Sequence, residues 1–291
     1  MEKEIPEQGA QEKPSIIDSL RYFDIIGIFE EDLAPATGWL YVDSKSLKIK
    51  QKPGGTAIDH TKPWIFVNPN PELTCNYFQA IFRNTLKHPI QCLHPRCLDC
   101  YKVVVKMHTV EQLLYVHKFQ VEFTKDHIGK DRFCKCGFED RSYVHYRCGA
   151  YFYNRGLDQG LERHQQVYDG LRLVFGNDAV SDVPGAYSDG KIEVILKRGC
   201  TEYELAHGPS DRWEINEQQK ALLDKIEAHF EIDKHCDFPT PDFVAEHTMF
   251  KWMCRGWETG DPTAKMFNAG GPYYTPPVTY HHYKKEKKSN G

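Results

Sequence analysis

The sequence predicts an α+β fold, an irregular mixed fold in which short strands and amphipathic helices follow one another along one chain. Some segments repeat apolar residues at helical spacing and others alternate apolar with polar residues, without the regular strand–helix–strand order of a doubly wound sheet. The 291 residues are 40% apolar and 13% aromatic, which is enough to bury the core of one large domain or two modest ones.

The first third of the chain predicts a polar arm, a hairpin and two helices. Residues 1–14 form a polar N-terminal arm, of a composition that does not fold alone. Apolar residues at 16–26 recur at helical spacing. Residues 38–51 alternate on both sides of a polar turn and predict a β-hairpin. A short strand is expected at 64–67, and Asn70-Pro71 has the chemistry of a helix start.

The middle of the chain predicts two strands and two helices. Residues 101–105, which follow the first cysteines and include three valines, predict a strand. Thr109 and Gln112 fit a capping box, in which each side chain binds the other residue's backbone amide at the start of a helix. One apolar stripe predicts a long helix at 157–174, and residues 192–196 alternate as a strand.

The last third predicts two more helices and a second arm. Asn216 is the expected N-cap of one helix, and Thr240-Pro241 starts the other. The globular α+β region is therefore predicted to span residues 15–259. Residues 260–291 are rich in Gly, Pro and Tyr and predict an extended C-terminal arm. Extended terminal arms suit docking to partner subunits.

Charge and cysteine content limit the function classes. The net charge of −4 gives no global basic excess, so nucleic acid would need a local patch. The N-terminus lacks an apolar signal region, and no run reaches the ~18 apolar residues that span a bilayer, so no membrane partner is expected. Ten cysteines without a secretory signal favour the cytoplasm, where clustered cysteines are more often metal ligands than disulfides.

The strongest local signal is a group of cysteines. Cys92, Cys97 and Cys100 lie within nine residues, and Cys134 and Cys136 form a second cluster. A structural zinc ion needs four thiolate or imidazole ligands in a tetrahedron, and a Cys-x-x-Cys turn presents two of them. These five cysteines are the predicted metal ligands, within a Cys-rich segment that spans residues 92–148.

The pattern resembles a zinc-ribbon or treble-clef arrangement over residues 92–136, in which two knuckles share one ion. It departs from that arrangement because the second knuckle is Cys-x-Cys and because Cys92 is additional. The ligand set is either Cys97, Cys100, Cys134 and Cys136, or a set in which Cys92 replaces one of them. An iron–sulfur cluster is the alternative cofactor, because the first three cysteines also have the x4-then-x2 spacing of plant-type clusters.

Two further segments are candidate sites. Cys200 follows a predicted strand and His207 lies seven residues later, so the two could serve as a nucleophile and its base. A solvated strand edge is the favoured interpretation of this segment. Residues 151–155 join aromatic and basic side chains that could stack on bases, although packing is favoured. No nucleotide-binding loop or hydrolase motif is present, so no catalytic residue is predicted.

These features predict a non-catalytic, zinc-stabilised binding or assembly subunit of a larger complex, with other protein subunits as partners. Two alternatives stay open. One is an iron–sulfur redox protein or metalloenzyme that uses the same cysteines. The other is a nucleic-acid-binding zinc module, for which nucleic acid is the partner.

Overall fold

The computed structural model describes residues 40–43, 45–46, 48–51, 63–68, 93–128, 130–217, 220–221, 224, 228–231 and 239–264. Several expectations lie outside these residues. They are the N-terminal arm, the helices expected at 16–26 and from Asn70, the C-terminal arm beyond residue 264, and Cys92.

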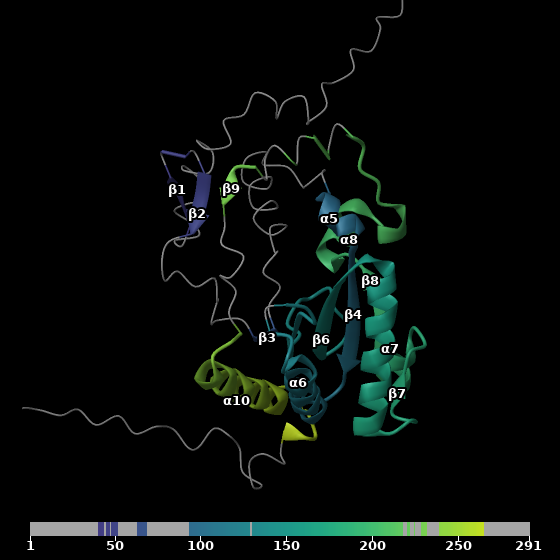
Figure 1. Ribbon diagram of the computed structural model, residues 1–291. Helices are drawn as coiled ribbons and strands as arrows, with labels where there is room; N and C mark the ends of the chain where they lie inside the picture. The colour runs from purple at the N-terminus through teal and green to yellow at the C-terminus, as the bar shows by residue number, and fades with distance from the viewer. Residues whose placement is uncertain are drawn as a thin grey trace, which may run out of the picture.

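A six-stranded sheet forms the centre of the described chain (Figure 1), in the order β3-β5-β6-β4-β8-β7. Its strands are β3 (Trp64–Asn68), β4 (Cys100–Met107), β5 (Cys134–Phe138), β6 (Cys148–Arg155), β7 (Val180–Ser181) and β8 (Ile192–Arg198). All neighbours pair antiparallel except β7, which is parallel to β8. The sheet is therefore mixed, and with its helices it gives the chain an α+β architecture.

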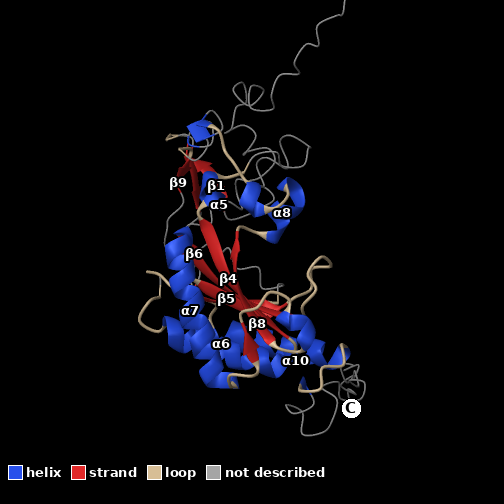
Figure 2. Cartoon of the chain, turned by 90° about the vertical axis from the view of Figure 1, so that its right-hand side faces the viewer, coloured by secondary structure: helices blue, strands red, loops and turns tan. Residues whose placement is uncertain are grey.

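Three helices build the core with this sheet. Helices α6 (Val110–Thr124) and α7 (Gly156–Phe175) connect β4 to β5 and β6 to the β7–β8 pair, and both contact the sheet. The order β4-α6-β5-β6-α7-β8 is that of a split β-α-β arrangement. Figure 2 shows α6, α7 and α10 (Asp242–Glu258) around the lower part of the strands. Helix α10 packs against α6 and β3.

Alternation along β4 separates the two faces of the sheet. Val103, Val105 and Met107 are fully buried in the core beneath the helices. Because successive side chains point to opposite faces of a strand, Lys102 and Lys106 lie on the face turned away from α6 and α7. One face of the sheet thus carries the hydrophobic core, and the other carries charge.

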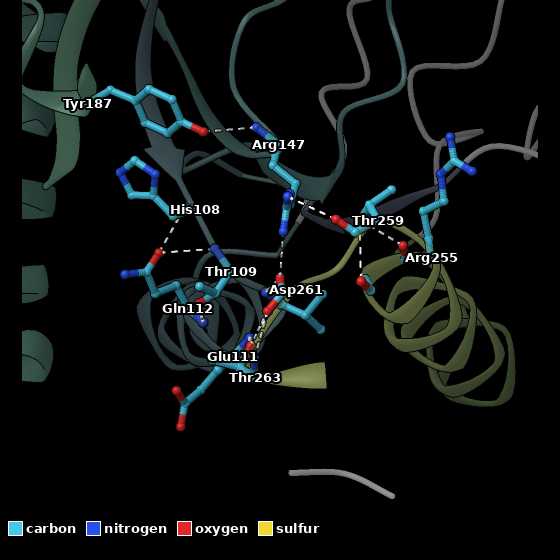
Figure 3. Close-up of polar contacts among 12 residues, drawn as sticks. His108, Thr109, Glu111, Gln112, Arg147, Tyr187, Arg255, Thr259, Asp261 and Thr263 are labelled. Atoms are coloured by element: carbon cyan, nitrogen blue, oxygen red, sulfur yellow. Dashed lines mark hydrogen bonds and ion pairs between the residues drawn. The ribbon is translucent and has the colours of Figure 1, made fainter. Parts of the chain in front are cut away.

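The first turn of α6 is bound by residues from its own cap and from the end of the described chain (Figure 3). The predicted capping box is confirmed, with Thr109 Oγ1 accepting from the Gln112 amide at 3.2 Å. Asp261 Oδ2 accepts from the Val110 amide at 2.8 Å, and Thr263 Oγ1 from the next amide at 3.2 Å. The amides that a helix start leaves without intrahelical partners are therefore all satisfied here. The first residues of the segment expected as a C-terminal arm thus lie on the core.

The remaining elements are short. Strands β1 (Leu40–Asp43) and β2 (Lys48–Gln51) form the predicted hairpin, and β9 (Phe230–Glu231) pairs with β2. The short helix α5 (Pro95–Leu98) precedes β4 in the chain, and the short helix α8 (Thr201–His207) follows β8. Single 3₁₀ turns are η2 (Ala186–Asp189) and η3 (Ser210–Arg212). None of the helices in the described ranges is long and apolar enough to cross a membrane.

Most predicted elements are confirmed, and two central strands were missed. The strands expected at 64–67, 101–105 and 192–196 lie within β3, β4 and β8, and the helices at 157–174 and after Pro241 are α7 and α10. The helix expected after Asn216 is helical at residues 217, 220, 221 and 224, but Phe230, to which the prediction extended it, lies in β9. The residues of β5 were interpreted as a metal-binding knuckle, and those of β6 as a segment of aromatic and basic side chains, with no strand predicted for either. Cysteines that alternate with other residues fit both a knuckle and a strand, so the pattern alone does not separate the two.

Candidate functional site

The face of the sheet turned away from α6 and α7 carries a pocket of about 240 Å³, which we call the sheet-face pocket. Its floor comes from alternate residues of β4, β6 and β8, and its wall from the β5–β6 connection and the start of α8. The lining residues are Lys102, Val104, Lys106, Arg141, Tyr143, Val144, His145, Tyr146, Tyr151, Ile195, Lys197, Gly199, Thr201 and Glu202.

The strand register brings the floor residues together. Val104 on β4 lies opposite Tyr151 on β6 and Ile195 on β8. Lys102, two residues earlier on β4, lies opposite Lys197. Residues paired across neighbouring strands point to the same face, so side chains from three strands converge at this point.

Four cationic side chains line the pocket, and three of them have carboxylate partners. These three charges are balanced within the described part of the chain. The pairs are Lys106 with Glu193 (Nζ to Oε1, 2.5 Å), Arg141 with Glu139 (Nε to Oε1, 2.6 Å) and Lys197 with Glu204.

Lys102 is the fourth cation, and its contacts differ. Its side chain is only 9% exposed. The ammonium donates to Cys200 Sγ at 2.7 Å and lies 5.3 Å from the centre of the Tyr153 ring, and no carboxylate of the described chain pairs with it. Burial lowers the pKa of Lys102, but the neighbouring groups of Cys200, Tyr153 and Cys100 outweigh burial and raise that pKa well above its ordinary value. The ammonium is therefore charged at neutral pH.

A hydrogen-bonded network fixes the pocket wall. The hydroxyls of Tyr146 and Tyr151 share a hydrogen bond of 2.5 Å, and Tyr151 also donates to Glu139 Oε2 at 3.1 Å. Arg141 donates to Glu139, to the Tyr151 hydroxyl at 2.9 Å and to Glu202. Burial raises the pKa of Tyr146 to about 12 and that of Tyr151 further, so both phenols stay protonated. The network holds Arg141 against the sheet.

A half-buried lysine, Lys135, lies next to this network. The Lys135 ammonium lies over three rings, at 4.7 Å from the centre of Trp64, 5.2 Å from Phe66 and 5.7 Å from Tyr151. Tyr151 is 8% exposed and tilts against Trp64, with ring centres 5.5 Å apart. The packing interpretation of this tyrosine is confirmed. Its ring is covered, so it does not offer a stacking surface to a base.

The predicted ligands Cys134 and Cys136 lie on the opposite face of the sheet. Both are buried in the main core beneath the helices, as is Cys148. Burial raises the pKa of all three thiols. Buried thiols of this kind behave as small hydrophobic side chains.

Cys97 and Cys100 lie elsewhere. Cys97 is buried on α5 in a small cluster with Leu93, Tyr203 and Trp213. Cys100 begins β4 and pairs with Arg155 on β6. Cys134, on β5, pairs with Phe152 at the other edge of β6, three residues before Arg155. Strand spacing and rise then separate the two Cα atoms by roughly 14 Å.

The structure therefore brings Cys134 near Cys136, and keeps both away from Cys100. A zinc ion holds each sulfur at about 2.3 Å. Among the residues that the structure describes, no group of three or more His, Cys, Asp or Glu side chains could hold a metal ion. Cys92 lies outside those residues, and the metal site stays a prediction.

The pair of Cys200 and His207 is not brought together. Cys200 is the N-cap of α8 and His207 its last residue, and a helix of that length separates them by about 10 Å. His207 instead stacks on Tyr203. The residue that binds Cys200 is Lys102, 98 positions earlier in the chain.

The pocket residues were not predicted from the sequence. One signal was available, because Lys102 and Lys106 interrupt an apolar run at positions that share one face of a strand. Arg141 and Tyr146 come from a connection without periodicity, and nothing local marks them. Comparison of the chain with known protein families, with curated proteins and with solved structures found no match.

Proposed function

We propose that the chain is a binding protein whose sheet-face pocket takes a small anionic ligand, with Lys102 as the central contact. The observation that carries this proposal is the buried Lys102 ammonium, which faces the pocket and contacts a thiol and a ring but no carboxylate of the described residues.

A buried charge without a counter-charge is unfavourable, because removal of the ion from water is not repaid by a partner. The neighbouring cations of the pocket have carboxylate partners, which are Glu193 on β8, Glu139 in the β5–β6 connection and Glu204 on α8. An anionic ligand would supply the charge that Lys102 lacks. Arg141 lies at the pocket wall but donates to Glu139, Tyr151 and Glu202, so Lys102 is the contact that the proposal assigns to the ligand.

The size of the pocket limits the ligand. A volume of about 240 Å³ is below the range of about 300–1,000 Å³ that holds drug-sized molecules. Inorganic phosphate or a small carboxylic or phosphorylated acid fits this volume.

Titration with inorganic phosphate tests the proposal. Calorimetry or backbone amide shifts should detect binding, and Lys102→Met should weaken the affinity about tenfold or more, which corresponds to about 1.4 kcal/mol. Lys191→Met removes an exposed lysine outside the pocket and should leave affinity unchanged. Equal phosphate affinity in native protein and Lys102→Met would refute the proposal, as would the absence of phosphate binding by the native protein.

The same titration separates a small anion from nucleic acid. An oligonucleotide that occupies several cations would bind with an affinity that falls steeply with salt. A single phosphate in the pocket would show a shallow salt dependence. Tight, salt-sensitive binding of an oligonucleotide would favour the nucleic-acid-binding alternative over a small anion.

A zinc-stabilised binding or assembly subunit, with a zinc-ribbon-like site, is the second candidate. The observation that favours it is the closeness of Cys97 and Cys100 in the chain, with Cys97 on α5 and Cys100 at the start of β4. Elemental analysis of purified protein should find zinc, and Cys97→Ser should lose metal and stability together. Iron with visible absorbance would instead support the iron–sulfur alternative. Metal-free, fully stable protein would exclude both metals.

A further inference from the structure

The floor of the sheet-face pocket is arranged in rows, which the pairing of β4 with β8 sets. Alternate residues of each strand point to the pocket side of the sheet, and residues opposite each other form one row. In order along β4, the rows are Lys102 with Lys197, Val104 with Ile195 and Lys106 with Glu193. We call the row of Val104 and Ile195 the middle row. It lies about 7 Å along the strands from the charged row on either side.

The middle row offers only hydrocarbon to a ligand. Val104 is buried and Ile195 is half-buried, and both line the pocket. Val144, from the β5–β6 connection, is a third aliphatic side chain of the lining. A ligand gains free energy here by burying an apolar group, because that removes apolar surface of both partners from water.

The row beyond the middle row has its charges matched. The Lys106 ammonium pairs with Glu193 at 2.5 Å and lies 5.8 Å from the centre of the Tyr146 ring. Glu193 Oε2 also accepts from the amides of Gly185 at 3.0 Å and Tyr187 at 2.9 Å. Both charges are therefore satisfied within the fold, and a second ligand charge would find no unmatched partner at this end.

We propose that the ligand of the sheet-face pocket is a monocarboxylate with a short apolar chain. Its carboxylate contacts Lys102, and its chain lies over Val104 and Ile195. This inference rests on the proposed anion binding and names the class of ligand that the same site takes. An inorganic anion uses only the contact with Lys102, whereas a monocarboxylate with a chain also uses the apolar row beside it.

Calorimetric titration of the full-length protein with acetate, butyrate and hexanoate tests the chain. The three acids carry the same charge and differ only in the number of methylene groups. Affinity should rise along the series by about fourfold for each methylene group that becomes buried. Equal affinities for the three acids would overturn the proposal.

Two further ligands have the chain of hexanoate but a different charge. Adipate carries a second carboxylate at the far end, and it should bind about tenfold or more weakly than hexanoate, because that charge would have to leave water without a partner. Hexanamide lacks the charge and should also bind about tenfold or more weakly. Adipate that binds as tightly as hexanoate would overturn the restriction to one carboxylate.

A variant of the middle row tests where the chain lies. Ile195→Thr keeps a β-branched side chain and makes the row more polar, so the ratio of hexanoate affinity to acetate affinity should fall several-fold. Val183→Thr makes a similar change at an exposed position outside the pocket, and the ratio should stay the same. An unchanged ratio in folded Ile195→Thr would refute this position of the chain.

Backbone amide shifts of the native protein give the same test without a variant. Hexanoate should shift the amides of Val104 and Ile195 more than acetate does, because only hexanoate has a chain that reaches the middle row. Equal shifts at these two amides with the two acids would contradict the proposal.

The two proposals fail in different ways. Binding of phosphate and acetate that depends on Lys102, with no gain from a longer chain, refutes the apolar part of the ligand and leaves anion binding intact. Equally tight binding of hexanoate and hexanamide, with no phosphate binding, refutes the proposed anion binding instead.

Discussion

Lys135 shows how competing effects act on a single side chain. Three aromatic rings surround its ammonium and favour the charged form through cation–π contacts. Burial opposes this, together with the positive charges of Lys102 and Arg141, and lowers the pKa of Lys135 to about 8. No ion pair or hydrogen bond within the described chain offsets the burial of this ammonium.

The pKa of Lys135 makes stability depend on pH. The folded-state value of about 8 lies below the ordinary value of about 10.4, so the unfolded chain binds more protons between these pH values. Stability therefore rises as pH increases from about 8 to about 10. Below pH 8 the whole penalty is present, at most roughly 3 kcal/mol before the ring contacts are counted.

Replacement of Lys135 by methionine should remove this penalty and keep the volume. We expect Lys135→Met to gain up to roughly 3 kcal/mol at pH 7, and this gain to shrink towards zero at pH 10. Urea unfolding at the two pH values measures both effects, with the exposed Lys191→Met as the control. A variant that is less stable than native protein at pH 7 would show that the ring contacts outweigh burial.

At the scale of elements, the start of α6 depends on Asp261. Its carboxylate accepts from the buried Val110 amide at 2.8 Å and from the amide and hydroxyl of Thr263, and lies 3.5 Å from the Arg147 guanidinium. One side chain therefore joins the helix start, the end of the β5–β6 connection and the residues that follow α10. Figure 3 shows these contacts converging on Asp261.

Asp261→Ala should destabilise the fold by about 1–3 kcal/mol, because it leaves a buried amide without a partner. Asp261→Asn keeps an acceptor and should lose less. Asp182→Ala, at an exposed position between β7 and η2, is the matched control. Urea unfolding of the three variants gives the comparison, and an unchanged midpoint for Asp261→Ala would contradict the capping role.

Local chemistry explains which elements the sequence could predict. The capping box at Thr109 is complete within one turn and is found as expected. The helix predicted at 157–174 is found as α7, but its buried residues are Gly160, Arg163, Val167 and Leu171, and Leu161 of the predicted apolar stripe is exposed. Strand β5 was missed because Cys134 and Cys136 satisfy two patterns at once. Strand β6 is almost wholly buried and has no alternation of polar and apolar residues to mark it.

At the scale of the whole molecule, the two faces of the sheet carry different kinds of side chain. The helix-covered face holds the core, and the other face holds the pocket with its cations. The pocket was beyond sequence reasoning because its residues come from β4, β6, β8, a connection and α8, and only the strand register brings them together. Cys100 and Cys134 lie on different faces of the sheet, and the metal site predicted from the cysteines stays a prediction.

The contact of Asp261 with Val110 also has a kinetic consequence. The two residues are 151 positions apart, and closure of a loop of that length costs about 4 kcal/mol in chain entropy, more than one capping bond returns. The contact therefore forms after the sheet has already drawn the chain together, late on the folding pathway. Asp261→Ala should accelerate unfolding and leave the refolding rate nearly unchanged, which stopped-flow measurements in urea can resolve.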